Sequence, residues 1–293
     1  MKVQCPRCFI AKVRPVGNFI RCGFFKRKSD SKIIRRFRCL ECSKTFSNAT
    51  WNKCFRQRKR HLNSWVRNLL VSNVSQRRTA RILGINRKTV VRKFHFLAEH
   101  ARETLKQTNL TFPESIEVEF DDLETAEHTK CKPISLTMAV ESYSRRILGF
   151  EVSPMPAKGK LASLSRKRYG VRPDERPLAR AKLFREIFPL IAIGAIIKTD
   201  ESPHYPKDIR NFFSHCRHQT FKGKMATVAG QGELKKVGHD PIFSINHTFA
   251  MLRANINRLI RRTWCTTKKY QNLSDHIAIY SVYHNQVLLQ ING

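Results

Sequence analysis

Acidic residues are scarce in this sequence, which has 22 Asp and Glu among 293 residues against 56 Lys and Arg. The excess positive charges, which give a formal net charge of +34, repel one another in a compact fold, so we expect a polyanionic partner such as a nucleic acid. Two alternatives remain open on charge alone. These are a ribosome-associated basic protein and a protein that binds an anionic membrane surface.

Long apolar runs are also missing. No stretch reaches the roughly 18 apolar residues that suggest a membrane-spanning helix, and the longest, Ile187–Ile197, is interrupted by Pro189 and Gly194. The first residues, MKVQCPRC, have no apolar core of the kind that a signal peptide has. We therefore expect no membrane contact and a cytoplasmic location, where disulfides are rare.

Two of the cysteine spacings point to a metal. Cys5 and Cys8 form one C-x-x-C pair, and Cys39 and Cys42 form a second. Two such pairs can place four thiolates around one Zn²⁺. Cys22 is a rival ligand without a nearby partner cysteine, and the remaining thiols, which we interpret as ordinary, are Cys54, Cys131, Cys216 and Cys265.

The positive charge is concentrated in the first part of the chain. Residues 1–112 hold 28 Lys and Arg against 4 Asp and Glu, a net charge of +24, and the remaining residues carry +10. The sequence predicts three domains: a zinc ribbon over residues 1–48, a helical DNA-binding domain over 49–112, and an α/β domain over 113–293. Strands at Gly17–Cys22 and Ile33–Cys39 would form the hairpin of the ribbon.

The helical domain contains a helix-turn-helix pattern from Ser75 to Phe94, after a helix at residues 60–71. Ser75 and Asn86 are suited to cap two helices, and Gly84 to occupy a left-handed turn between them. A basic helical hairpin without a role in DNA binding is the alternative. We expect residues 98–114 to form a linker. The side chains predicted to face the groove or the phosphates are Arg87, Lys88, Thr89, Arg92 and Lys93.

The third domain alternates between strand and helix patterns. Three strands, a helix, a strand, a helix and a closing helix follow in the order of a ribonuclease-H-like α/β domain. A further short strand precedes the closing helices. The predicted strands are Ile116–Phe120, Pro133–Val140, Ile147–Pro154, Ile191–Thr199 and Arg217–Phe221, and the predicted helices are Asp174–Phe188, Lys207–Phe213, Pro241–Trp264 and Asn272–Leu289.

Acidic residues follow two of these strands. Asp121 and Asp122 come directly after the first strand, and Asp200 directly after the buried strand. If the two strands are neighbours, Asp121 and Asp200 converge at the carboxyl edge of the sheet. Carboxylates that close repel each other unless a cation such as Mg²⁺ or Mn²⁺ lies between them, and two such ions suit phosphodiester chemistry. Ordinary turn or cap aspartates are the alternative.

The chain resembles a bacterial insertion-sequence transposase of the DDE class. The resemblance is carried by the ribbon and helix-turn-helix, by V-E-F-D-D-L-E-T at Val118–Thr125, by I-K-T-D at Ile197–Asp200 and by the pattern L-R…R-L-x-R-x-T at Leu252–Thr263. That last segment is similar to the final helix of the insertion sequence one family. Membership implies cleavage at transposon ends and joining of the freed 3′ hydroxyl to target DNA.

The resemblance assigns Asp121 as the first metal-binding aspartate and Asp200 as the second, with Asp122 as the rival for the first position. Asn246 stands where the family has a glutamate. Three accounts remain open: Asn246 completes a variant triad, Glu233 or Glu201 supplies the missing carboxylate, or the protein is catalytically weak. The neighbouring His247 would contact DNA or pack in the helix.

Basic residues surround the final helix, and we expect them to track the DNA backbone. They are Arg253, Arg258, Arg261 and Arg262, with Lys268 and Lys269 beyond. Further basic stretches, expected to be loops near DNA, contain Lys158, Lys160, Arg166, Lys167 and Arg168, and Lys235 and Lys236. We expect Trp264 to anchor the core.

The predicted protein is therefore a bacterial DNA transposase associated with the nucleoid, with Zn²⁺ in the ribbon and Mg²⁺ or Mn²⁺ at the catalytic site. Since two DNA ends are cut together, we expect a dimer or a larger assembly. A transposase-derived DNA-binding regulator without catalytic activity is the main rival, and Asn246 favours it. A zinc-dependent RNA-binding protein is the second rival.

Overall fold

The computed structural model describes residues 4–10, 18–28, 30–222, 240–260 and 265–291. The chain divides into two compact units, Met1–Trp65 and Val66–Gly293, which are described separately. None of the helices in the described ranges combines the length and the apolar character that a bilayer crossing requires.

The first unit is a small antiparallel sheet with the order β1-β2-β3. Its core contains Phe37 and Phe46, whose rings contact each other, together with Cys8 and Cys39. The predicted hairpin is present, although its first strand is longer than expected at its C-terminal end. The elements are α1 (Pro6–Ile10), β1 (Phe19–Lys26), β2 (Ile33–Cys39), β3 (Thr45–Phe46) and the 3₁₀ turns η1 (Asn48–Trp51) and η2 (Arg60–Leu62).

Helix α2 (Asn63–Leu70) contains the point in the chain where the first unit ends and the second begins, and α3 (Gln76–Ile82) and α4 (Arg87–Asn109) follow in the second unit. As predicted, the Ser75 hydroxyl accepts a hydrogen bond from the Arg78 N–H at the start of α3, and Asn86 accepts one from the Lys88 N–H at the start of α4. Gly84 has the left-handed φ of +60° that the turn requires. α3 and α4 are thus joined by a tight, capped turn.

The prediction of a linker at residues 98–114 is wrong over most of its length, because α4 continues to Asn109. Ala98, Ala101 and Leu105 extend the buried stripe that begins at Val90 and Phe94. This helical spacing keeps one face of the helix in the core for its whole length.

The sheet of the second unit has five strands in the order β6-β5-β4-β7-β8. β4 pairs antiparallel with β5 and β5 with β6, whereas β4 pairs parallel with β7 and β7 with β8. The unit is therefore a mixed α/β structure, with β4 at the centre of the sheet. The strands are β4 (Ser115–Ala126), β5 (Pro133–Glu141), β6 (Ile147–Pro154), β7 (Ile191–Asp200) and β8 (Arg217–Phe221).

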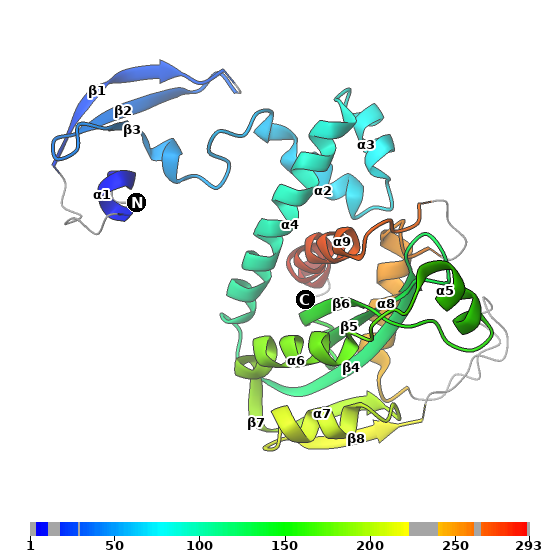
Figure 1. The fold of residues 1–293 in the computed structure, drawn as a ribbon. Helices are drawn as coiled ribbons and strands as arrows, with labels where there is room; N and C mark the ends of the chain where they lie inside the picture. The colour runs from blue at the N-terminus through cyan, green and yellow to red at the C-terminus, as the bar shows by residue number, and fades with distance from the viewer. Residues whose placement is uncertain (1–3, 11–17, 29, 223–239, 261–264, 292–293) are drawn as a thin grey trace. The chain divides into compact units, whose positions relative to one another are not determined.

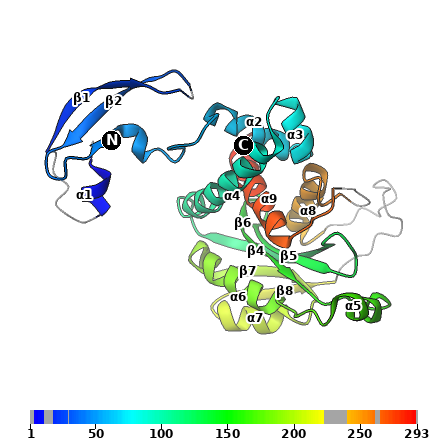
Figure 2. The ribbon, with the colours of Figure 1, turned by 45° about the horizontal axis from the view of Figure 1, so that its top comes forward.

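Helices cover both faces of this sheet (Figure 1; Figure 2). One core joins the sheet to α4, α8 and α9, and the other joins the opposite face to α6 and α7. The helical segment before the sheet thus shares its core with the sheet. The remaining elements are α5 (Leu161–Tyr169), α6 (Arg176–Ile187), η3 (Phe188–Leu190), α7 (Tyr205–Phe212), α8 (Phe243–Asn255), α9 (Tyr270–Tyr283), the π-helical η5 (His284–Leu288) and α10 (Leu289–Ile291).

Two predictions about the C-terminal half are wrong. The helix expected over Pro241–Trp264 ends at Asn255, because Ile256 has extended φ and ψ of −111° and 107° and is fully buried. The basic stretch around Arg166–Arg168 is not a loop but the last turn of α5.

Candidate functional site

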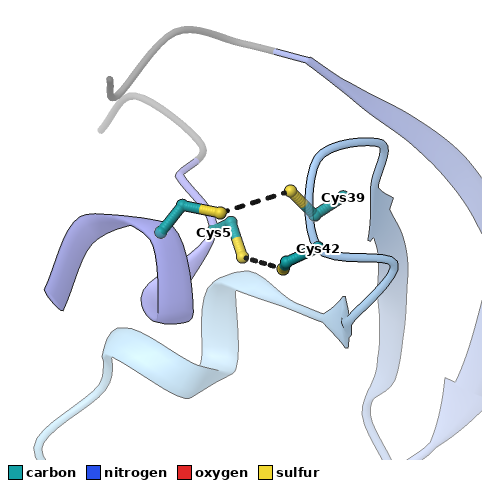
Figure 3. Close-up of side chains that lie close together, drawn as sticks. Cys5, Cys39 and Cys42 are labelled. Carbon is teal, nitrogen blue, oxygen red and sulfur yellow. Dashed lines mark hydrogen bonds between the residues drawn. The ribbon is translucent and has the colours of Figure 1, made fainter. Parts of the chain in front are cut away.

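The four predicted zinc ligands come from two local turns. Cys5 immediately precedes α1 and Cys8 lies within it, while Cys39 ends β2 and Cys42 lies in the turn that follows. In Figure 3 the side chains of Cys5 and Cys42 point toward each other, beside Cys39. The folding of the hairpin thus brings both C-x-x-C pairs to one place.

The sulfur positions suit one tetrahedral ion. The Cys5 and Cys42 Sγ atoms are 3.5 Å apart, those of Cys8 and Cys39 are 3.7 Å apart, and all four atoms lie within 4.8 Å of one another. Tetrahedral Zn–S bonds of about 2.3 Å place sulfurs about 3.8 Å apart, whereas a disulfide requires about 2.05 Å. All four thiols are free. The cluster can therefore hold a metal ion such as Zn²⁺.

The thiols differ in acidity. A backbone hydrogen bond from Lys44 lowers the pKa of Cys42 to about 7, whereas desolvation and the neighbouring thiols raise the pKa of Cys8 to about 12. Four thiolates in one place repel one another unless a cation neutralises them. Within the described ranges, no other group of three or more His, Cys, Asp and Glu ligand atoms is as close together.

Asp121 and Asp200 lie on neighbouring parallel strands. Phe120 pairs with Thr199, so the next residues along β4 and β7 are Asp121 and Asp200. Paired positions on adjacent strands face the same side of the sheet, and here that side is the one covered by α8. Contrary to prediction, neither aspartate follows its strand: β7 includes Asp200, and β4 continues beyond Asp121 to Ala126 because it pairs with β5 over that length.

The environment of Asp121 penalises its negative charge. Burial raises its pKa to about 7, and the nearby charges of Asp200 and Asp122 act in the same direction. The Asp122 N–H, which donates to Asp121 Oδ1 over 2.7 Å, and the charge of Arg253 oppose the shift. Asp121 and Asp200 are therefore close enough to repel each other electrostatically.

Asp122, the rival for the first metal-binding position, lies on the opposite face of the sheet. Its Oδ1 accepts hydrogen bonds from the Ser135 hydroxyl, at 3.1 Å, and from the Thr137 hydroxyl. Side chains alternate along a strand, so Asp121 and Asp122 cannot face the same side. Of the two, Asp121 is the one that shares a face with Asp200.

Asn246 lies in the first turns of α8 and is exposed. Its Nδ2 donates to Asp240 Oδ2 over 2.9 Å, and Asp240 Oδ1 accepts from the Ile242 N–H over 3.1 Å. The amide oxygen, which is the atom that would bind a cation, is not the atom that contacts Asp240. Sequence reasoning missed Asp240, although an aspartate just before a helix commonly accepts a hydrogen bond from the backbone N–H two residues on, as it does here from Ile242. Of the proposed substitutes, Glu201 is exposed and Glu233 lies outside the described residues.

Glu119 is a second residue that sequence reasoning missed. It is 2 % exposed and lies on the same face of β4 as Asp121. Its carboxylate accepts hydrogen bonds from the Ile245 N–H at 2.8 Å and from the Ser142 hydroxyl at 3.0 Å. Burial nevertheless raises its pKa. Glu119 thus fastens the start of α8 to the strand that carries Asp121, and an acidic residue inside a buried strand is the signal that could have identified it.

The predicted backbone-binding arginines do not share one environment. Arg253 is half-buried on α8 and its charge acts on Asp121. The Arg258 guanidinium lies 5.8 Å from the ring centroid of Phe94, and burial lowers its pKa, so it packs against the helices. His247 is held by Arg145, whose Nη1 lies 3.1 Å from His247 Nδ1. Arg261, Arg262, Trp264, Lys235 and Lys236 lie outside the described residues.

Most of the side chains predicted to face DNA on α4 are accessible. Arg87, Lys88 and Arg92 are exposed and Thr89 is half-buried. The prediction for Lys93 is wrong, because this residue is 2 % exposed. Position 93 follows Val90 by three residues and therefore falls on the face of α4 that packs in the core.

No family model matches the chain, and no curated protein sequence matches it significantly.

Proposed function

We propose that this chain is a DNA transposase that binds the ends of a mobile element and catalyses metal-dependent DNA cleavage and strand transfer. In this proposal Val66–Gly293 contains a ribonuclease-H-like catalytic core, and the Cys₄ cluster belongs to a zinc ribbon. The succession of three strands, helices, a strand, a helix and a further strand before α8 supports this interpretation of the core, as does the resemblance of the sequence to the DDE transposases.

One observation carries the proposal. Asp121 and Asp200 occupy successive register positions on parallel neighbours β4 and β7, on one face of the sheet, and their charges interact. Reactive sites in sheets of this kind are built at the carboxyl ends of parallel strands. Two carboxylates brought together at such an edge repel each other, and a divalent cation bound between them would relieve this repulsion.

The donor set fits a hard divalent cation. Asp121, Asp200 and the amide oxygen of Asn246 would hold Mg²⁺ or Mn²⁺, which supplies activation of an attacking oxygen and neutralises charge on the leaving oxygen. The residues themselves do the positioning. The Asp122 N–H orients the Asp121 carboxylate, and Glu119 fixes the start of α8 relative to β4.

Contacts with double-stranded DNA would come from the basic helices. The exposed cations at the start of α4, Arg87, Lys88 and Arg92, follow a capped turn of the kind that places a helix in the major groove. The net charge of +34 supports a polyanion as the partner. Because two ends are joined to one target, the working form would be at least a dimer, at the nucleoid.

A regulator that binds DNA without cutting it is the second candidate. Asn246 favours it, because an amide brings no negative charge to the site and here donates to Asp240. The difference between the two candidates lies in catalysis alone, and both require DNA binding.

A strand-transfer assay distinguishes them. The full chain is incubated with Mg²⁺, target plasmid and labelled duplexes carrying the inverted repeats that a search of the DNA beside the gene would identify. We expect joined products from the wild type, none from Asp121→Asn or Asp200→Asn, and wild-type levels from Glu114→Gln, which removes an exposed acidic residue before β4. End binding should be the same in all four proteins.

Binding of the ends without any joining by the wild type would support the regulator. Activity in Asp200→Asn would contradict the site itself. Tighter binding of structured RNA than of duplex ends at fixed salt would contradict both candidates and support the RNA-binding rival.

A further inference from the structure

The chain from Val152 to Pro173, which runs from within β6 almost to α6, has no acidic residue. From Glu151 to Asp174 the chain contains six Lys and Arg and no Asp or Glu between these two positions. This segment contains α5, which lies beyond one end of the sheet in both views (Figure 1; Figure 2). The like charges of such a segment repel one another. We therefore expect this repulsion to be offset either by contacts within the protein or by a bound anionic partner.

One side of α5 is fastened to the loop between β4 and β5. The buried Ser165 hydroxyl donates to the Cys131 carbonyl over 2.6 Å, and the Lys132 ammonium lies 4.5 Å from the ring centroid of Tyr169. Beyond the helix, Arg172 pairs with Glu127 at 3.4 Å. These contacts hold α5 in place, and none of them involves a cationic side chain of α5 itself.

The cationic side chains of α5 itself face solvent. Arg166, Lys167 and Arg168 are exposed and occupy consecutive helical positions, so they fan over about 200° of the helix. Lys160 before the helix and Lys130 in the supporting loop are also exposed. None of these five forms an ion pair with a described residue, whereas Lys158 pairs with Glu124 at 2.7 Å.

The entry to α5 lies further along β4 than the aspartate pair. Glu124, which contacts Lys158 at this entry, is three residues beyond Asp121 on β4, and its side chain lies on the opposite face of the sheet from Asp121. At about 3.3 Å per residue this is about 10 Å along the strand. Successive phosphates along one DNA strand advance by about 3.4 Å, so 10 Å corresponds to about three nucleotides.

We propose that the five cations Lys130, Lys160, Arg166, Lys167 and Arg168, here called the α5 surface, bind the backbone of duplex DNA about three nucleotides and more from the phosphate held at Asp121 and Asp200. This inference rests on the proposed function and adds a second DNA contact to the one on α4. Charge complementarity identifies the occupant: phosphates are the ligand that suits five exposed cations with no ion-pair partner among the described residues.

A structural role accounts for only part of the surface. Three cations in the last turn of α5 stabilise a helix through its dipole. Lys160 precedes the helix and Lys130 lies outside it, so this effect does not explain them. A role in helix stability and a role in DNA binding can be distinguished, because only the second makes these cations contribute to the affinity for DNA.

The test compares two triple variants of the full chain. Arg166→Gln/Lys167→Gln/Arg168→Gln removes three charges from the α5 surface. The matched control, Lys106→Gln/Arg185→Gln/Arg217→Gln, removes three exposed charges from α4, α6 and the first residue of β8. Binding of a short labelled duplex of arbitrary sequence is measured by fluorescence anisotropy between about 50 and 200 mM salt. Zinc content and circular dichroism check that each variant is folded.

We expect the α5 variant to bind more weakly, with the slope of log K against log salt reduced by about 2 to 3, since each phosphate contact contributes about 0.9. The control should keep the wild-type slope. An unchanged slope in the α5 variant, with normal binding by the wild type, would overturn the α5 proposal and leave the transposase proposal intact. Failure of the wild type to bind duplex DNA would instead overturn the transposase proposal.

A second variant guards against misfolding. Lys130→Glu/Lys160→Glu leaves the last turn of α5 unchanged and should weaken binding at least as much as the loss of two contacts. If both variants keep the wild-type slope and lose only thermal stability, the surface is structural and the proposal is wrong. Tighter binding of duplex RNA than of DNA by the wild type would also overturn it, because the proposed occupant is DNA.

Discussion

The carboxylate of Glu119 accepts a hydrogen bond from the backbone N–H of Ile245 over 2.8 Å. The two residues are 126 positions apart in the chain. The N–H groups in the first turn of a helix have no partner within the helix, so this bond satisfies one of them while joining α8 to β4. It therefore links the strand of Asp121 to the helix of Asn246.

Glu119→Ala should destabilise the protein. The buried N–H of Ile245 and the Ser142 hydroxyl would lose their acceptor, at a cost of about 1–3 kcal/mol for an unsatisfied buried group. Glu119→Gln keeps an oxygen for Ile245, and the Ser142 hydroxyl can accept from the new amide, so its loss should be smaller. Urea unfolding measures both changes. Equal destabilisation by the two variants would show that the hydrogen bond to Ile245 is not what Glu119 contributes.

Removing one cysteine should release the metal. We expect one Zn²⁺ per wild-type chain by mass spectrometry of metals, much less in Cys8→Ser, and a full ion in Cys22→Ser, because Cys22 is outside the cluster. The first unit should unfold with the loss, since binding energy at structural zinc sites is largely folding energy. A normal zinc content in Cys8→Ser would contradict the Cys₄ assignment.

Substitution at position 246 should affect catalysis more than binding. If the Asn246 amide oxygen is a ligand, Asn246→Ala should abolish cleavage, and Asn246→Glu should lower the Mg²⁺ concentration needed for half activity because it adds a charge. Asp240→Ala should cause a smaller loss, since Asp240 only orients the amide. DNA binding provides the control. Full cleavage by Asn246→Ala would show that the third metal ligand is a residue other than Asn246.

Stability should fall in mild acid because of His276. Burial lowers the pKa of this histidine to about 4, while its Nε2–H donates to the Leu70 carbonyl over 2.9 Å. A histidine in the unfolded chain titrates near 6.5, so between these values the unfolded state binds more protons. The contribution is complete above pH 6.5 and is lost as the pH falls toward 4, on the order of 3 kcal/mol in total.

His276→Gln should flatten this dependence, because glutamine keeps an N–H donor for Leu70 and does not titrate. Thermal or urea unfolding at several pH values between 4.5 and 7.5 measures the difference in slope. Identical slopes in the wild type and the variant would exclude His276 as the source.

Gly149→Ala should destabilise the sheet where α6 crosses it. A Cβ at this position would lie 2.8 Å from both Ile187 Cγ2 and Leu183 Cδ1, and overpacking of this kind costs about 1–3 kcal/mol. The double variant Gly149→Ala/Leu183→Ala should lose less than the sum of its single changes, because removing the leucine makes room. Strict additivity would show that the contact is not the cause.

Local patterns in the sequence predicted much of the secondary structure. β6 and β8 have the predicted bounds, and the caps at Ser75 and Asn86 form as expected. These features depend on neighbouring residues, namely the alternation along a strand and the side chain before a helix. The hydrogen bond between Glu119 and the start of α8 could not be predicted from neighbouring residues, because its donor, Ile245, is 126 positions away in the chain.

The burial of Lys93 illustrates the limit of local reasoning. The helix-turn-helix pattern predicts that Lys93 faces DNA, because it stands among other cations, although its position also fits the buried face of α4. Which of the two holds depends on what packs against the helix, and here α4 packs on α9 and the sheet. Asp240 was overlooked for a similar reason, since its contact with Asn246 requires the turn before α8.

By itself, the sequence determined the cysteine pairs, the charge imbalance and the mixed α/β character, because composition and spacing carry these properties without any long-range contact. Only the tertiary structure decided that Asp121 rather than Asp122 shares a face with Asp200, and which cations reach solvent. The register between β4 and β7 sets the first, and the packing of α4 and α5 sets the second. Both arise from pairings between residues far apart in the chain, which no local pattern specifies.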